Sequence, residues 1–214
     1  MHFHIITLFP NALDSYLRAS IIGRAIEEKK LTVTAYNPRD FTDDPYQRVD
    51  RRPYGGGPGM VLSAEPVLRA VEKAVGRKKN VKIIIFTPSG KQFSQRDAQQ
   101  LGKKHTHIVL IAGRYEGIDA RVGKILKAEE VSIGSYVLTG GELPALAIVD
   151  AVARQIPGVL GKRESLEELR VASPDVYTRP EVLTYKKKNY RVPKVLLSGN
   201  HRDIDAWRTK QQKN

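Results

Sequence analysis

The sequence predicts an α/β domain built on a mainly parallel sheet, followed by a small C-terminal domain. Two observations predict the sheet: short runs rich in β-branched residues recur along the first two thirds of the chain, and helical patterns lie between most of them. Strands that alternate with helices are typical of α/β domains whose strands run parallel. A hydrophobic content of 41% supports a substantial core, and 214 residues suffice for one sizeable domain with an appendage.

The strands expected from apolar, β-branched runs cover residues 2–7, 31–36, 81–86, 107–112 and, more briefly, 129–133. The helices expected from apolar periodicity cover residues 11–28, 64–75, 94–103, a short segment after 117, and 142–156. Ser94 and Asp97 have the spacing of a capping box at the start of the third helix, and Pro144 suits the first turn of the last one.

The periodic pattern ends after residue 156. Pro157, Gly158 and Gly161 terminate the helix, and a charged stretch without clear periodicity follows. We therefore expect a domain of residues 1–160, a linker of residues 161–175 that orders on binding, and a basic helical domain of residues 176–214.

Charge and composition restrict the classes of function that the chain can have. The formal net charge is +13, and residues 161–214 carry about as much of it as the first 160 residues together. Nucleic acid is the commonest partner of so basic a chain. No apolar stretch approaches the length of a membrane span, and the absence of cysteine excludes disulfides and thiolate nucleophiles. We expect a soluble protein of the cytoplasm, without a membrane partner.

The familiar phosphate-binding motifs are absent. The stretch YGGGPGM at 54–60 does not match G-x-G-x-x-G, and GSYVLTGGE at 134–142 lacks the Gly-Lys-Ser/Thr of a P-loop. The pairs His2/His4 and His105/His107 each lie on one side of a strand, but no cysteine or carboxylate cluster accompanies them. We assign no metal ligands and expect these histidines to pack at strand ends or to be exposed.

Three glycine-containing loops follow expected strand ends, where open α/β sheets bind ligands. They are TPSG at 87–90, GRYEG at 113–117 and GSYVLTGG at 134–141. Glycines let the backbone approach a ligand closely, and the aromatic and aliphatic residues of these loops offer apolar walls. This combination suits a flat ligand with a neutral base and few phosphates.

Long ordered motifs then indicate a family. RPYGGGPGMV, AGRYEGIDARV, SIGSYVLTGGELPALAIVDAVARQIPGVLG, YTRPEVL and VPKVLLSGNH span nearly the whole chain. Together they resemble the bacterial tRNA (guanine-N1)-methyltransferases, the TrmD family of the SPOUT class. The resemblance implies a deep trefoil knot, a homodimer with its active site between subunits, and methyl transfer from S-adenosylmethionine to the guanosine 3′ of the anticodon, position 37.

The resemblance also implies the site residues. Residues expected to bind the cofactor are Phe86, Thr87, Pro88, Gly113, Tyr115, Glu116, Gly117, Ile133, Gly134, Ser135, Tyr136, Val137, Leu138, Gly140, Gly141 and Pro144. Arg154 matches the family arginine that donates to guanine O6, and residues 50–60 match positions that line the cofactor and guanine pockets. The lysines at 186–188, with Arg191 and Lys194, are expected to contact tRNA phosphates. The family has been linked to a magnesium requirement, for which we identify no ligand cluster.

One position departs from the family pattern. The family motif after the knot reads approximately Glu-Glu-Asp-Ser-Phe, with the aspartate as proton acceptor, whereas this chain has Glu167, Glu168 and Leu169 in the corresponding places. Leucine cannot accept a proton. Either Glu168 serves as the base, or the chain is a degenerate, non-catalytic relative that binds tRNA or cofactor.

Overall fold

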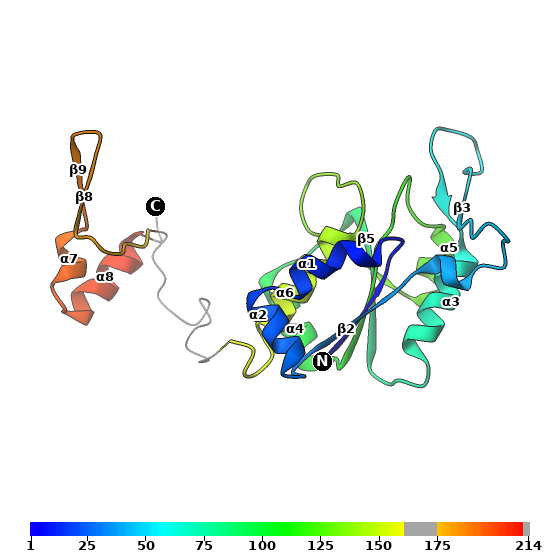
Figure 1. Cartoon of the computed structure of the whole chain (residues 1–214), viewed down its shortest axis with the longest axis horizontal. Coiled ribbons are helices and arrows are strands. Elements are labelled where there is room, and N and C mark those ends of the chain that lie inside the picture. Colours follow the sequence, from blue (N-terminus) through cyan, green and yellow to red (C-terminus); the bar gives the residue numbers. More distant parts are fainter. Residues whose placement is uncertain (161–174, 212–214) are drawn as a thin grey trace. The chain divides into compact units, whose positions relative to one another are not determined.

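A computed structural model describes residues 1–160 and 175–211, and the chain divides into two compact units after Leu160 (Figure 1). The first unit is built on a five-stranded sheet with the order β2-β1-β6-β5-β7, in which every neighbouring pair is parallel. The strands are β1 (His2–Ile6), β2 (Thr32–Tyr36), β5 (Val81–Gln92), β6 (His107–Ile111) and β7 (Glu129–Ser132). These bounds confirm the places of the expected strands, although β5 extends beyond residue 86, and they confirm the parallel α/β architecture.

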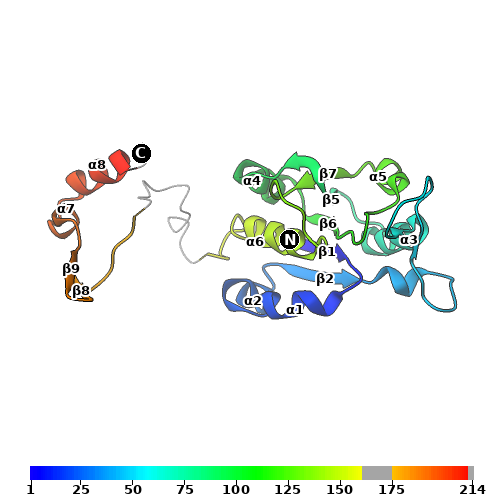
Figure 2. The ribbon, with the colours of Figure 1, turned by 90° about the horizontal axis from the view of Figure 1, so that it is seen from above.

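Helices cover both faces of this sheet, so the strands are buried between two layers (Figure 2). One apolar core joins the sheet to α2 (Ser20–Glu27), α4 (Gln95–Lys104) and α6 (Glu142–Ala153). The other core joins the opposite face to α3 (Ala64–Val75) and α5 (Ala120–Leu126). Burial on both faces explains why the strands read as continuous apolar runs rather than alternating ones.

Local signals determine where several helices begin. The Ser94 side chain accepts from the backbone of Asp97 and the Asp97 side chain accepts from the backbone of Ser94, which confirms the capping box of α4. Pro144 lies in the first turn of α6, where its missing N–H leaves no helical hydrogen bond unmade.

The single helix expected over residues 11–28 is wrong. The chain forms a 3₁₀ turn at Pro10–Leu13, a short α1 (Asp14–Leu17), and then α2. Ser20 takes a positive φ of 46°, which breaks the helix, and a side chain at Gly23 would collide with the carbonyl oxygen of Arg18. The tight approach of α1 to α2 therefore requires a glycine at position 23.

The second correction concerns the loop expected at residues 87–90. β5 does not end at Phe86: its pairing with β7 shifts between Phe86 and Lys91 and then continues to Gln92. Gly90 passes so close to β7 that a side chain there would meet the backbone of Val131 at 2.6 Å. The segment is thus an irregularity within a strand rather than a loop after it.

The C-terminal unit is not purely helical, contrary to expectation. Its described residues form an antiparallel hairpin of β8 (Val182–Tyr185) and β9 (Lys188–Arg191), followed by α7 (Lys194–Leu197) and α8 (His201–Gln211). The expected linker, apart from Asp175, lies outside the described residues. None of the helices described is long and apolar enough to cross a membrane.

Candidate functional site

A cavity of about 450 Å³ lies beside the irregular segment of β5 and at the carboxyl ends of β6 and β7. Its walls come from the irregular segment of β5, the loop after β6, the loop after β7 and the first turn of α6. Parallel strands present their carboxyl ends at one edge of the sheet, and loops that are distant in sequence therefore meet there.

The cavity gathers almost all of the residues that the sequence analysis assigned to the cofactor. Those that line it are Phe86, Thr87, Pro88, Gly113, Tyr115, Glu116, Gly117, Ile133, Gly134, Tyr136, Val137, Leu138, Gly140, Gly141 and Pro144; Ser135 does not. Sequence reasoning missed other lining residues, notably Arg114, Asp119, Glu130 and Thr139.

The loops after β6 and β7 are bonded directly to each other. The amide of Gly141 donates to the carbonyl of Gly113 at 3.0 Å, and Arg114 and Gly140 form an isolated antiparallel bridge. A side chain at position 141 would lie 2.5 Å from the Cα of Ala112, and one at position 140 would collide with the Arg114 side chain. Both glycines are therefore required by the contact between the loops.

An ion pair between a half-buried arginine and a buried glutamate anchors this contact. The Arg114 guanidinium lies 3.0 Å from a carboxylate oxygen of Glu142, whose other oxygen accepts from the Thr7 hydroxyl at 2.7 Å. Arg114 also donates to the carbonyl of Thr139 at 3.3 Å and stacks over the Phe9 ring. Glu142 is only 5% exposed, and burial of its charge is compensated by these partners. The Arg114 Nε is buried and has no hydrogen-bond partner in the described part of the chain.

The loop after β6 has a strained but well-supported backbone. Tyr115 adopts a positive φ of 60°, which is unusual for a residue with a side chain. Hydrogen bonds hold it on both sides: the amide of Glu116 donates to Met60, and the carbonyl of Gly117 accepts from Leu62. A side chain at Gly59 would collide with the Glu116 side chain, at 2.5 Å from a carboxylate oxygen. Residues 59–62 therefore pack directly against the loop after β6.

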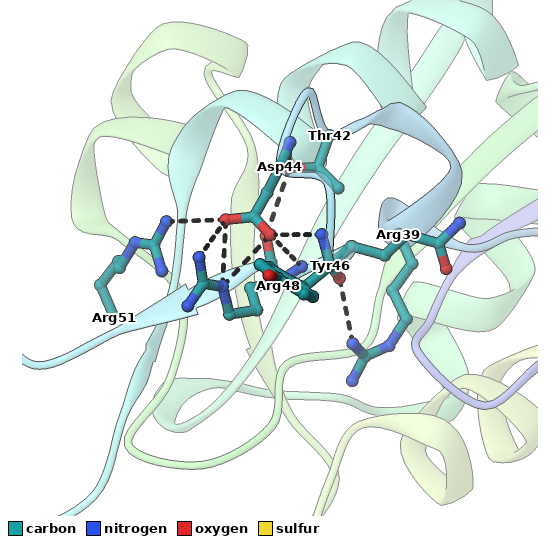
Figure 3. A network of polar contacts seen from close by, with 7 residues as sticks. Arg39, Thr42, Asp44, Tyr46, Arg48 and Arg51 are labelled. Atoms are coloured by element: carbon teal, nitrogen blue, oxygen red, sulfur yellow. Dashed lines mark hydrogen bonds and ion pairs between the residues drawn. The ribbon is translucent and has the colours of Figure 1, made fainter.

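The chain just before that segment is organised around one carboxylate (Figure 3). Asp44 accepts from the backbone amide of Tyr46 at 2.9 Å and from the guanidinium groups of Arg48 and Arg51 at 3.0–3.2 Å. These arginines lower the pKa of Asp44 far below its usual value, with Arg48 as the largest cause. The network holds Arg51, the last residue of β3 (Asp50–Arg51). β3 pairs with β4 (Val61–Leu62), and this pairing brings together the two ends of the glycine-rich loop that connects them.

The loop after β7 presents both backbone and apolar side chains. The Ser132 hydroxyl donates to the carbonyl of Gly134 at 2.9 Å, and the Tyr136 ring lies against the Cα of Gly134. Val137 is 81% exposed and Leu138 36% exposed, so apolar surface remains uncovered at the cavity. Exposed apolar surface of this kind favours a ligand or a partner at this loop.

Arg154, one of the two expected catalytic residues, does not line the cavity of its own chain. Arg154 caps the C-terminal end of α6, whereas the cavity lies at its N-terminal end, about 15 Å away at 1.5 Å per residue. The Arg154 side chain makes no hydrogen bond or ion pair with the part of the chain that is described. Glu167, Glu168 and Leu169 lie outside the described residues.

Three of the histidines converge, which their sequence spacing did not show. Nitrogens of His2, His4 and His107 all lie within 4.8 Å of one another, and the rings of His2 and His4 stack at 4.1 Å. Parallel stacking keeps their in-plane lone pairs from meeting at one point. Burial lowers the pKa of all three rings, and nearby positive charges, including Lys78, lower it further and oppose a bound cation as well. The three rings therefore pack against one another at the ends of β1 and β6 and stay neutral at physiological pH.

Comparison with known proteins gives the family. The family model described as tRNA (Guanine-1)-methyltransferase TrmD matches residues 1–214. Relatives named tRNA (guanine-N(1)-)-methyltransferase include one from Buchnera aphidicola, 46% identical over 98% of this chain and 88% of the relative. Another, from Campylobacter jejuni, is 43% identical over 98% of this chain and 91% of the relative. A third, from Pseudoalteromonas atlantica, is 45% identical over 98% of this chain and 79% of the relative. The chain belongs to the TrmD family of tRNA (guanine-1)-methyltransferases.

Proposed function

We propose that this chain transfers a methyl group from S-adenosylmethionine to N1 of guanosine 37, the nucleotide 3′ of the tRNA anticodon. The observation that carries the proposal is the cavity, because the irregular segment of β5 and the loops after β6 and β7 meet there around the residues that the family motifs single out. Membership of a family named for this reaction supports it. We further propose that the protein works in the cytoplasm.

The residues around the cavity fit S-adenosylmethionine. Backbone groups of residues 133–138 provide neutral donors and acceptors for an adenine edge, with Leu138 as an apolar wall. Glu116 and Glu130 line the cavity and can accept hydrogen bonds from hydroxyl or ammonium groups. The orphaned Arg114 Nε offers a further buried donor. When bound, S-adenosylmethionine supplies a methyl group on a positively charged sulfur.

Methylation of N1 requires removal of the N1 proton and support for negative charge on O6. Arg154 suits the second task, because a guanidinium stays charged at every physiological pH. We propose Glu168 as the proton acceptor, since it is adjacent to Leu169, which occupies the place of the family aspartate. Magnesium remains without an assigned ligand: in residues 1–160 and 175–211, the three-histidine cluster is the single grouping of three potential ligands.

We propose that two copies of the chain form the active unit, with Arg154 of one copy serving the cavity of the other. The separation of Arg154 from its own cavity supports this arrangement. Apolar side chains near the cavity, such as Leu143 at 62% and Phe9 at 46% exposure, offer surface for a second copy. The close threading of Gly141 against Ala112 supports the proposed trefoil knot.

The C-terminal unit is proposed to bind tRNA through its cations. Lys186, Lys187 and Lys188 lie at the turn of the β8–β9 hairpin and are exposed, as are Arg191 and Lys194. Exposed lysines and arginines bind phosphates without sequence preference.

The proposal is tested by incubating the full chain with S-adenosylmethionine and an unmodified tRNA transcript, and by identifying the methylated nucleoside by mass spectrometry. N1-methylguanosine at position 37 is expected, and a transcript with adenosine at that position should accept no methyl group. Under single-turnover conditions Glu168→Gln should reduce the rate at least ~10²-fold, because general-base help is typically worth ~10²–10⁴-fold. Glu167→Gln is the matched control and should keep most of the rate. A Glu168→Gln rate within a few-fold of the parent would exclude it as the base.

The degenerate, non-catalytic alternative finds no support among the relatives, which are named as methyltransferases. Absence of methyl transfer by a preparation that binds both tRNA and cofactor would revive it.

A further inference from the structure

The β8–β9 hairpin sorts its side chains onto two different faces. Leu183 pairs with Tyr190, and Tyr185 pairs with Lys188. Residues directly opposite each other in an antiparallel pair share a face, as do residues two apart on a strand. Leu183, Tyr185, Lys188 and Tyr190 therefore form one face of the hairpin, which we call the tyrosine face.

The tyrosine face is largely uncovered. Tyr185 is 59% exposed, Tyr190 54% and Leu183 55%. On the opposite face Val182 is partly buried, and the Thr184 hydroxyl donates to Asn189 at 2.7 Å. Two tyrosines and a leucine on one small exposed hairpin expose much more apolar surface than scattered single residues do.

The turn that joins the two strands places lysines where lysine is unfavourable. Lys186 and Lys187 both have a positive φ, of 48° and 62°. A two-residue turn with positive φ at both positions is normally filled by Asn-Gly, because side chains crowd the backbone in this region. Strain of this kind concentrates at functional positions. The Lys186 ammonium also lies 5.5 Å from the centre of the Tyr185 ring, beside the tyrosine face.

We propose that the tyrosine face is a stacking platform for unpaired nucleotides of RNA, with the lysine turn holding the adjoining phosphates. The proposal rests on the proposed function, which makes tRNA the substrate, and adds the nature of the contact. Aromatic rings that alternate with cations are the usual means of binding single-stranded RNA, since every base offers a face for stacking. An uninterrupted duplex keeps its bases stacked on one another and cannot use the platform.

Charge complementarity identifies RNA as the occupant. Three consecutive lysines lie at the tip of the hairpin, and one of them, Lys188, lies on the tyrosine face itself. A second copy of the same hairpin would place lysine against lysine at this face and be repelled, so the proposed dimer is not expected to form through it.

Stacking on the tyrosines and phosphate binding by the lysines respond differently to salt concentration, which allows a direct test. Binding of the full chain to a tRNA transcript with guanosine 37 is measured by fluorescence anisotropy over a range of salt concentrations. The double variant Tyr185→Leu/Tyr190→Leu should lose about 10- to 100-fold in affinity at every salt concentration, because stacking releases no counterions. The matched control Tyr185→Phe/Tyr190→Phe keeps the rings and should bind like the parent.

Replacing the lysines should instead change how strongly the affinity depends on salt concentration. Lys186→Gln/Lys187→Gln should lower the slope of log affinity against log salt by about 0.7–0.9 for each phosphate that the variant no longer neutralises. Lys186→Asn/Lys187→Gly should lower the salt slope by the same amount. It should also raise the melting temperature, because asparagine and glycine adopt a positive φ more readily than lysine does. Removal of two cations far from the hairpin in sequence, by Arg77→Gln/Lys79→Gln, should leave the slope nearly unchanged.

Several outcomes would overturn the platform. The first is that the Leu variant binds tRNA with parental affinity, and the second is that the Phe variant loses as much tRNA affinity as the Leu variant. The third is that the Leu variant loses as much affinity for an uninterrupted RNA duplex as for tRNA. The fourth is that the Leu variant changes its oligomeric state in sedimentation, which would identify a second copy as the occupant. Methyl transfer by the parent is measured on the same preparations. An inactive parent contradicts the proposed function, whereas an active parent with an unaffected Leu variant contradicts the platform alone.

Discussion

His4 shows how one buried residue can make the fold sensitive to acid. It is fully buried in β1, and its ring nitrogens lie 3.3 Å from the Tyr36 hydroxyl and from a nitrogen of His107. Burial, reinforced by the charges of His2, Lys78 and His107, lowers the pKa of His4 to about 4. The folded state therefore keeps the ring neutral, whereas the unfolded chain protonates it near pH 6.5. The stability that depends on the neutral ring is complete above about pH 6.5 and is lost as the pH falls towards 4.

We predict that the free energy of unfolding decreases between about pH 6.5 and about pH 4, by up to about 3 kcal/mol from His4. Urea unfolding at several pH values measures this. His4→Gln removes the titrating group, so its unfolding free energy should depend less steeply on pH even if it is lower throughout. Parallel pH profiles for the parent and His4→Gln would contradict the prediction.

At the scale of elements, the loops after β6 and β7 depend on each other for their shape. Gly141 approaches the backbone of Ala112, and the Arg114–Glu142 pair lies beside this contact. This contact adds to the hydrogen bonds that join the loop after β6 to Met60 and Leu62, so a change at the contact is expected to disturb both loops.

We predict that Gly141→Ala abolishes binding of S-adenosylhomocysteine in calorimetry and lowers the melting temperature, because a methyl group 2.5 Å from the Ala112 Cα forces the loops apart. Leu138→Glu should weaken binding at least about tenfold at an unchanged melting temperature, since the residue is 36% exposed and its loss affects the apolar wall alone. Gly123→Ala, at another glycine that lines the cavity, should leave the melting temperature unchanged or raise it, because the nearest atom to its new methyl is 3.6 Å away and α5 is retained. Parental affinity in both Gly141→Ala and Leu138→Glu would reject the cavity as the cofactor site.

At the scale of the whole molecule, α6 separates two parts of the proposed machinery. Its first turn borders the cavity and its last residue precedes Arg154, about 15 Å further along the axis. A rigid helix cannot bring these ends together within one chain. A second copy can supply the missing arginine.

We predict that two inactive variants restore each other. Arg154→Ala retains its cavity and Leu138→Glu retains its arginine, so a mixed dimer contains one complete site if Arg154 acts on the partner's cavity. Random exchange should recover about one quarter of parental methyl transfer, because half of the dimers are mixed and each has one working site. No recovery, with mixed dimers present by native mass spectrometry, would show that Arg154 acts within its own chain.

Much of the fold is determined by local sequence. Apolar β-branched runs located the strands, and the Ser94–Asp97 spacing located the start of α4. The glycine-containing loops could be assigned to one edge of the sheet because parallel strands end on the same side. Continuous apolar runs for the strands and helical periodicity for the helices carry this information, and reading them needs no knowledge of distant contacts.

Other features were decided only by the tertiary structure. Glu142 bonds to Thr7, 135 positions earlier in the sequence, and the three histidines meet because β1 and β6 are neighbours in the sheet. The shift in β5 depends on its pairing with β7, and the break between α1 and α2 depends on how closely their backbones approach. Such contacts arise from packing between segments that are far apart along the chain, and the local pattern around each residue does not specify its eventual partner.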